Sequence, residues 1–315
     1  SLYLGGVHCA ALSSGTAAIH LALIMIGVEK GDVIICQSFT FSATANPIVY
    51  LGANPIFIDS ESDTWNMDPN LLEQAINESL KKGKKPKAII FVNLYGMPAK
   101  IEDILFLANK YEIPVIEDAA ESLGSRYKGI ACGNFGKMSV LSFNGNKIIT
   151  TSGGGALVSK DNNYITKARF LATQARDDAP HYQHSEIGYN YRMSNVVAGV
   201  GRGQMEVLEN RIAVRRENNR FYRSILKDFD GISFQNEPIG HFSNYWLTTI
   251  LVNKDKCGVS REDIRLAMEK ESIETRPLWK PMHLQPVFNK YLTYSSSISE
   301  KYFNNGLCLP SGSNL

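Results

Sequence analysis

The strongest constraint on the fold is the alternation of short, β-branched runs with helix-length segments over the first half of the chain. Four runs of this kind are expected to be strands: Val33–Ile35, Pro55–Ile58, Ala88–Val92 and Pro114–Ile116. Strands separated by helices pair in parallel, because the helix returns the chain to the same end of the sheet. The sequence therefore predicts an α/β fold with a mostly parallel sheet covered by helices.

A helix is also expected directly after the string Ser13–Ala17, with Gly27 near its end. Backbone N–H groups and hydroxyls at the start of a helix converge on an anion, so this string is a candidate phosphate site. An ordinary Ser/Thr N-cap explains the same residues, and both interpretations remain open here. The string is neither a Walker loop nor a GxGxxG fingerprint, which weakens nucleoside triphosphate and dinucleotide hypotheses.

The second half of the chain has a different character. Strands are expected at 138–143 and 156–159, after which the alternation stops and a long charged helix or helix pair runs from 194 to 229. Glycines at 199, 201 and 203 in this stretch are poor helix formers, so we expect them to pack closely on a neighbour.

A strand at 246–252 and a helix at 260–270 are expected to belong to a smaller domain, and Ser260 with Asp263 resembles a capping box. We predict a large domain over residues 1–205 and a small C-terminal domain over residues 206–315. Both ends of the printed chain are expected to be cut within structured regions, which truncates the small domain.

Composition excludes several classes of protein. The 33 Lys and Arg residues against 31 Asp and Glu leave a net charge of +2, which provides no basic surface for nucleic acid and favours small-molecule partners. Five cysteines without CxxC spacing argue against a disulfide framework and a zinc cluster. The most apolar early run, Ala17–Val28, is too short to cross a bilayer. We predict a cytoplasmic protein without a membrane segment.

Two carboxylates follow the expected strand that ends at Ile116. Asp118 and Glu121 stand where open α/β sheets bind ligands, and Asp118 can form a charge pair with a cationic ring nitrogen. A helix-capping Asp beside a solvated Glu is equally compatible with the string.

Lys147 lies in the string SFNGNK, which begins at Ser142 after a strand and leads into the glycine-rich turn TTSGGG. No packed core needs such a polar stretch, so a lysine there can lie in a cleft. Burial turns a lysine into a nucleophilic amine, which Schiff-base chemistry requires. Most lysines are solvated surface charges, and the string alone leaves that alternative open.

Further candidates are weaker by themselves. Phe41 is a core residue or a ring that stacks on a flat cofactor. His181 and His184 have HxxH spacing but no acidic or thiol partner near them, so we predict loop histidines and no metal site. Arg276 and His283 stand in a proline-rich segment that is typical of a surface loop able to reach a ligand.

In their order along the chain, seven motifs resemble the DegT/DnrJ/EryC1/StrS family of pyridoxal-phosphate sugar aminotransferases. They are SSGTAAIHLAL, SFTFSATANPI, FVNLYG, EDAAESLGS, SFNGNKIITTSGGGALVS, GYNYRMSNV and ETRPLWKPMH, and they span essentially the whole chain. The strings TQAR, ETRPLWKPMH and CLPSG are especially similar to the branch that makes the 4-amino group of UDP-N-acetylbacillosamine precursors. Related branches make legionaminic-acid precursors or perosamine.

The resemblance implies fold type I, as in aspartate aminotransferase, a homodimer with shared active sites, and pyridoxal 5'-phosphate as cofactor. It implies that Lys147 is the catalytic residue that forms the Schiff base, while Asp118 pairs with the pyridine nitrogen. The remaining implied cofactor contacts are with the phosphate (Thr16, Ala17, Ser142 and, in the neighbouring subunit's site, Asn190), the ring face (Phe41) and the phenolic oxygen (Glu121). Glu121 departs from the Gln or His of many relatives.

The implied reaction transfers the amino group of L-glutamate to C4 of a nucleotide-linked 4-keto-6-deoxy sugar, a UDP-2-acetamido-2,6-dideoxy-4-keto-hexose. Candidate substrate contacts are Arg176, His181, Arg276 and His283. Two alternatives keep the fold: a sugar dehydratase, which typically carries His in place of the lysine, and a non-catalytic regulatory protein. A nicotinamide-dependent oxidoreductase is a further alternative, weakened by the missing GxGxxG motif.

Overall fold

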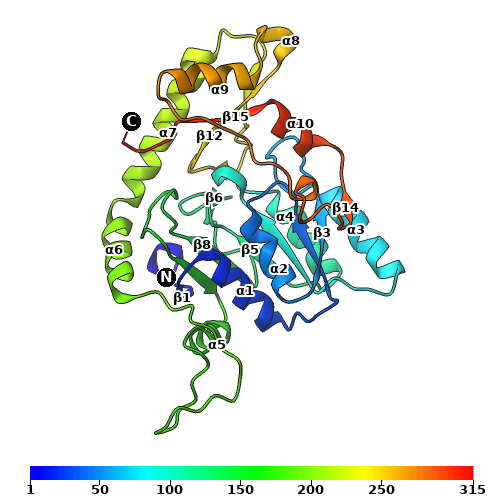
Figure 1. Ribbon diagram of the computed structural model, residues 1–315, viewed down its shortest axis with the longest axis vertical. Helices are drawn as coiled ribbons and strands as arrows, with labels where there is room; N and C mark the ends of the chain where they lie inside the picture. The colour runs from blue at the N-terminus through cyan, green and yellow to red at the C-terminus, as the bar shows by residue number, and fades with distance from the viewer. Residues whose placement is uncertain (315) are drawn as a thin grey trace.

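The computed structural model describes residues 1–314, and its strands form one large and two smaller sheets (Figure 1). The helices are α1 (Gly15–Ile26), α2 (Asn46–Tyr50), α3 (Pro69–Lys81), α4 (Ile101–Lys110), α5 (Asn162–Ala172), α6 (Asn195–Glu206), α7 (Leu208–Leu226), α8 (Lys254–Cys257), α9 (Arg261–Lys270) and α10 (Ile298–Asn305). Short 3-10 turns cover Leu2–Leu4, Ser42–Thr44, Leu94–Gly96 and Met282–Leu284.

The large sheet has the strand order β1-β9-β8-β5-β4-β2-β3-β14. Its strands are β1 (His8–Leu12), β2 (Val33–Gln37), β3 (Asn54–Ile58), β4 (Ala88–Val92), β5 (Val115–Asp118), β8 (Met138–Ser142), β9 (Gly155–Ser159) and β14 (Thr293–Tyr294). All pairs from β8 to β14 are parallel, whereas β9 runs antiparallel to both β8 and β1. The predicted α/β fold with a mostly parallel sheet is confirmed.

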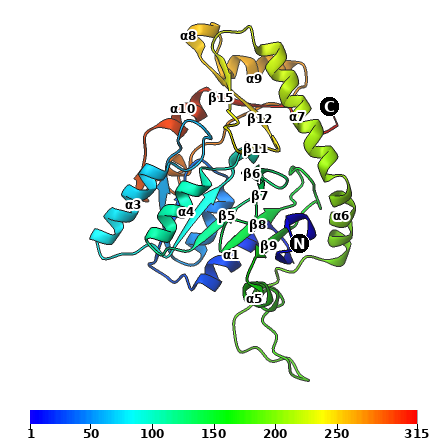
Figure 2. The ribbon, with the colours of Figure 1, turned by 180° about the vertical axis from the view of Figure 1, so that it is seen from behind.

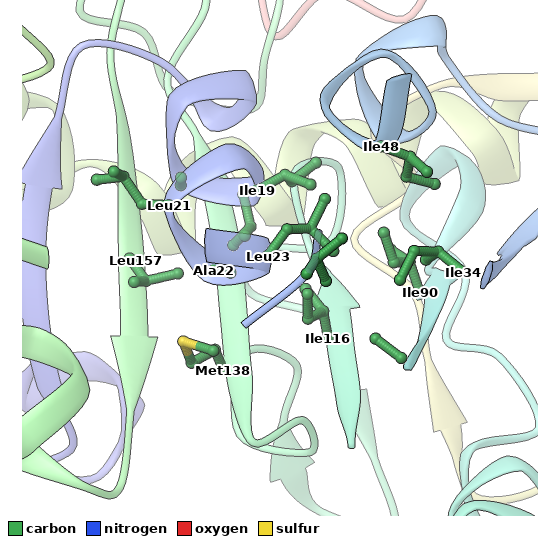
Figure 3. Close-up of a cluster of buried hydrophobic side chains, with 14 of the residues drawn as sticks. Ile19, Leu21, Ala22, Leu23, Ile34, Ile48, Ile90, Ile116, Met138 and Leu157 are labelled. Carbon is green, nitrogen blue, oxygen red and sulfur yellow. The ribbon is translucent and has the colours of Figure 1, made fainter. Parts of the chain in front are cut away.

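Helix α1 packs its apolar residues onto this sheet and is capped as expected. Ala17 N donates to Ser14 Oγ at 3.0 Å, and Gly27 ends the helix in the left-handed conformation. Figure 3 shows side chains of α1, such as Ile19 and Leu23, facing those of strands β2, β4, β5, β8 and β9. Because this face is fully buried, it fixes the position of the N-terminus of α1 against the ends of the strands.

The C-terminal part builds an antiparallel sheet in the order β10-β12-β15-β13. Its strands are β10 (Ile232–Phe234), β12 (Thr248–Val252), β13 (Arg276–Pro277) and β15 (Gly306–Leu309), while β6 (Arg126–Tyr127), β7 (Ile130–Ala131) and β11 (His241–Phe242) form the third sheet. Helix α9 begins with the predicted capping box of Ser260 and Asp263. The predicted division of the chain at residues 205 and 206 falls at the end of α6 and stays a prediction.

Between α5 and α6 the chain forms a long excursion that leaves the body of the molecule (Figures 1 and 2). Helix α6, which follows this excursion, has no buried residue. The expectation that its glycines pack on a neighbour is wrong within the described chain for Gly199 and Gly203, since a Cβ atom there would meet nothing within 4 Å. Only at Gly201 would a Cβ atom approach a neighbour, the Thr151 methyl group, at 3.0 Å.

Among residues 1–314, no helix combines the length and the apolar character that a membrane crossing requires.

Candidate active site

A cleft of about 700 Å³ opens where the parallel strands of the large sheet end. It is lined by the N-terminus of α1, by Asp118 and Ser142 at the ends of β5 and β8, and by residues after β2. Ligands bind at this edge in open α/β sheets because the loops that follow the strands gather there. Residues 274–276, Trp279 and residues 308–311 of the C-terminal part line the cleft as well.

One end of the cleft is suited to an anion. Thr16 lies in the first turn of α1 and lines the cleft together with Ser142. Gly15 approaches so closely that its Cβ atom would lie 3.3 Å from that of Ser142. Gly155 is packed more tightly still, because a Cβ atom there would lie 2.4 Å from the backbone nitrogen of Gly15. The glycines thus bring the positive end of the helix dipole to the cleft wall.

The Asp118 carboxylate lies in the cleft and is 4% exposed. Its oxygens accept hydrogen bonds from Thr44 Oγ1 at 2.8 Å and from Ala120 N at 3.1 Å. Burial raises the pKa of Asp118, and these hydrogen bonds and the Lys147 charge oppose that effect. A buried carboxylate held in this way is a ready partner for a cationic group of a ligand.

Lys147 and Glu121 form a buried ion pair in the same cleft. Lys147 Nζ lies 3.5 Å from Glu121 Oε1, and the two side chains are 10% and 3% exposed. Glu121 Oε2 accepts a hydrogen bond from Tyr95 N at 2.7 Å. Burial raises the pKa of Glu121 to about 7, although the Lys147 charge opposes the rise. A buried carboxylate with a raised pKa beside an amine is an arrangement typical of acid–base chemistry.

Aromatic rings cover the side of the cleft next to the lysine. Phe41 is 56% exposed and its ring centroid lies 5.6 Å from that of Trp279. Trp246 is buried, with its ring centroid 4.1 Å from Lys147 Nζ. Phe39, by contrast, is a core residue. Flat faces of this kind suit a planar or ring-shaped ligand.

The structure brings seven of the predicted residues together in one cleft: Thr16, Phe41, Asp118, Glu121, Ser142, Lys147 and Arg276. Arg276 is exposed and pairs with Glu274, which also lines the cleft. Ala17 lies outside the lining, and its N–H group is donated to Ser14.

Four other predicted residues lie away from this chain's own cleft. Asn190, Arg176 and His181 are exposed on the excursion between α5 and α6, where the Arg176 guanidinium stacks on Tyr182. His283 is held between Ser38 Oγ at 2.6 Å and Glu300 Oε1 at 3.1 Å.

Sequence reasoning did not identify Thr44, Tyr95 or Trp246 as site residues. Thr44 and Tyr95 belong to the motifs SFTFSATANPI and FVNLYG. These motifs carry the family resemblance, but they did not indicate that Thr44 binds Asp118 or that Tyr95 binds Glu121. Trp246 was expected only as the start of a strand. Within the described part of the chain, no group of three or more His, Cys, Asp or Glu residues is arranged to hold a metal ion.

Comparison with known proteins agrees with this geometry. The family model described as the DegT/DnrJ/EryC1/StrS aminotransferase family matches residues 1–315. EpsN of Bacillus subtilis (strain 168), named as a pyridoxal phosphate-dependent aminotransferase, is 56% identical over 99% of this chain and 81% of its own length. GDP-perosamine synthase of Escherichia coli O157:H7 is 37% identical over 96% of this chain and 80% of its own.

Among solved structures, a DegT DnrJ EryC1 StrS aminotransferase from Brucella abortus superimposes with a TM-score of 0.92 at 30% sequence identity. The match covers 100% of this chain and 83% of that one.

Proposed function

Because the chain belongs to the DegT/DnrJ/EryC1/StrS aminotransferase family, a family of pyridoxal phosphate-dependent sugar aminotransferases, we propose that it moves the amino group of L-glutamate to C4 of a UDP-linked 4-keto-6-deoxy sugar. The sugar is a UDP-2-acetamido-2,6-dideoxy-4-keto-hexose. The observation that carries the proposal is the buried Lys147 amine, which lies in one cleft with an anion site and the Asp118 carboxylate.

The residues present fit pyridoxal phosphate. The α1 N-terminus offers backbone N–H groups to an anion, and Gly155 allows the backbone of Gly15 to pack closely against it. Thr16 and Ser142 would hold the phosphate group. Asp118 would pair with the ring nitrogen, and the exposed face of Phe41 would cover the ring. The cofactor supplies an electron-withdrawing ring that stabilises negative charge at the carbon that gains or loses the amino group.

The protein's own groups position the substrates and move protons. Lys147 is the base that takes a proton at Nζ from one carbon centre and returns it to another. Glu121, 3.5 Å away, carries the opposite charge in its ionised form, and burial raises its pKa to about 7. Tyr95 N fixes the orientation of the Glu121 carboxylate. Burial of both groups excludes water that would otherwise screen the pair.

The UDP-linked substrate is supported by the placement of two of the three motifs that resemble the bacillosamine branch. Glu274, Thr275 and Arg276 begin the string ETRPLWKPMH, and all three line the cleft. Residues 308–311, from the string CLPSG, line it as well. The string TQAR, which ends at Arg176, lies outside this chain's cleft.

The absorption spectrum of the purified, pyridoxal phosphate-loaded protein tests the amino donor. We expect L-glutamate to bleach the yellow band without any sugar present, and Lys147→Ala to abolish turnover. A yellow protein that does not bleach would point to the dehydratase, and a protein that binds no pyridoxal phosphate would point to a regulatory role.

A competition between nucleotide sugars tests the acceptor. The loaded protein is supplied with L-glutamate and equal amounts of a UDP-linked and a GDP-linked 4-keto-6-deoxy sugar, and both amino sugars are quantified by mass spectrometry. We expect the UDP-linked product to form faster. Preference for the GDP-linked sugar would overturn this assignment while leaving the aminotransferase activity intact.

We also propose that a second copy of the chain covers α6 and the excursion before it, and receives Asn190 in its cleft. Val196 and Val200 on α6 and Ile187 before it are large apolar side chains that are at least half exposed. Asn190 is exposed and does not line its own chain's cleft. An apolar face of this kind is typical of an interface between copies.

Mixing two inactive variants tests whether Asn190 of one copy completes the active site of the other. Lys147→Ala and Asn190→Ala proteins are unfolded together and refolded, so that half of the dimers contain one copy of each. If Asn190 serves the partner's site, each mixed dimer regains one intact site, and about a quarter of the wild-type activity returns. If no activity returns, Asn190 acts within its own chain, and an active Asn190→Ala protein before mixing would show that Asn190 has no role in either site.

A further inference from the structure

The Lys147 amine rests on the face of a buried tryptophan that none of the motifs marks as functional. Trp246 is 1% exposed, and its ring centroid lies 4.1 Å from Lys147 Nζ. An ammonium group over an indole face is attracted by the ring's negative potential. The ring also limits the directions in which the four-carbon side chain of Lys147 can extend.

The same tryptophan holds the turn that carries the lysine. Trp246 Nε1 donates a hydrogen bond to Asn146 O at 2.8 Å, one residue before Lys147. The two residues that it joins are 100 positions apart in the chain. One side chain therefore fixes both the backbone and the terminal amine of Lys147.

Asn244 connects Trp246 to Glu121, the acidic partner of Lys147. Its Oδ1 accepts a hydrogen bond from Trp246 N at 2.8 Å, and its Nδ2 donates to Glu121 O and to Leu123 O, both at 2.9 Å. Gly96 leaves room for this amide, because a Cβ atom there would lie 1.9 Å from Asn244 Oδ1. The backbones of Trp246 and Glu121 are thus joined through one buried amide.

We propose that Trp246 is a positioning residue that sets the place of the Lys147 amine opposite Glu121 before the cofactor arrives. The proposal rests on the proposed function in that Lys147 is the residue that bonds to pyridoxal phosphate. In that step the amine adds to the aldehyde carbon, a C=N bond forms and one water molecule leaves. Capture is fast only when the amine already points at the carbon, since misplacement by 1 Å slows such steps strongly.

Two variants separate the contacts of the indole. Trp246→Phe keeps an aromatic face but loses the hydrogen bond to Asn146, whereas Trp246→Leu loses both. Trp65→Leu is the matched control, because Trp65 is equally buried in the same apolar cluster and does not line the cleft of Lys147.

The first measurement is lysine labelling of the cofactor-free proteins with a trace of acetic anhydride, quantified by mass spectrometry relative to the exposed Lys160. We expect the Lys147 to Lys160 labelling ratio to rise by about threefold in Trp246→Leu, because the indole ring no longer covers the amine and shields it from the reagent. The second is the rate of covalent capture of saturating pyridoxal phosphate, which we expect to fall about tenfold or more in the same variant.

Faster labelling of Lys147 together with slower capture of pyridoxal phosphate distinguishes loss of positioning from partial unfolding of the protein. Trp246→Phe is expected to lie between wild type and Trp246→Leu in both. Unchanged capture in Trp246→Leu, or the same pair of changes in Trp65→Leu, would overturn the proposal. Failure of the wild-type protein to capture pyridoxal phosphate at Lys147 would instead refute the proposed function.

Discussion

Replacing Glu121 by Gln should remove a specific part of the pH dependence of folding stability. The carboxyl group has an ordinary pKa of 4.5, and burial raises it to about 7 in the folded protein. Between these two pH values the folded protein keeps a proton on Glu121 that the unfolded chain has lost. The contribution of this group to stability is therefore fully present below pH 4.5 and is lost as the pH rises through about 7.

The size of the effect follows from the two pKa values. At about 1.4 kcal/mol for each pH unit, the interval from 4.5 to about 7 corresponds to about 3 kcal/mol of unfolding free energy. Glu121 is 4% exposed, so solvent screens the effect little. Gln keeps an oxygen that can accept the hydrogen bond from Tyr95 N and does not titrate.

The assay is urea unfolding of the cofactor-free wild-type and Glu121→Gln proteins at a series of pH values from about 4.5 to 8. We expect the wild type to lose about 3 kcal/mol more than the variant across this range. Because the Lys147 charge holds the pKa of Glu121 down, Lys147→Ala should extend the loss to higher pH. A difference between wild type and Glu121→Gln that stays constant with pH would refute the reasoning.

Three further substitutions test local parts of the structure. Asp59→Ala should lower the unfolding free energy by about 3 kcal/mol or more in urea titrations, because N–H and hydroxyl groups just before α10 and in its first turn lose their buried acceptor. A loss below about 1 kcal/mol would show that water replaces the carboxylate. Ser260→Ala should cost about 1 kcal/mol by the same method, since it removes half of the capping box with Asp263, and an unchanged midpoint would contradict this. Gly155→Ala should weaken pyridoxal phosphate binding about tenfold or more in a spectroscopic titration, because the alanine methyl group would overlap the backbone of Gly15. An unchanged affinity would mean that the N-terminus of α1 shifts to make room for the methyl group.

Local patterns were enough to predict the elements that build the large sheet. The four early strands form within a few residues of the expected positions, and α1 is capped by Ser14 and Gly27. These features depend on side-chain periodicity and capping, which are determined by residues close together in the chain. The resemblance of the seven motifs added the family, and the family model matches residues 1–315.

Local patterns failed where the outcome depends on distant partners. The glycines of α6 predicted close packing, but α6 contributes no buried residue to this chain. The sequence also did not indicate that Ser38 and Glu300, from distant parts of the chain, hold the His283 ring, and the predicted contact of His283 with substrate stays a prediction. A periodic pattern indicates which face of a helix carries apolar or small side chains. It does not indicate which other part of the structure packs against that face.

The sequence by itself determined the α/β architecture, the caps of α1 and α9 and the identity of the cleft residues that stand at strand ends, such as Asp118 and Ser142. Only the tertiary structure decided how Lys147, Glu121 and Trp246 meet, because their contacts join residues 26 and 100 positions apart. Such contacts form when buried elements pack against each other, and their burial also decides the pKa of Glu121. The reactive arrangement is therefore a property of packing, while the sheet beneath it is a property of local sequence.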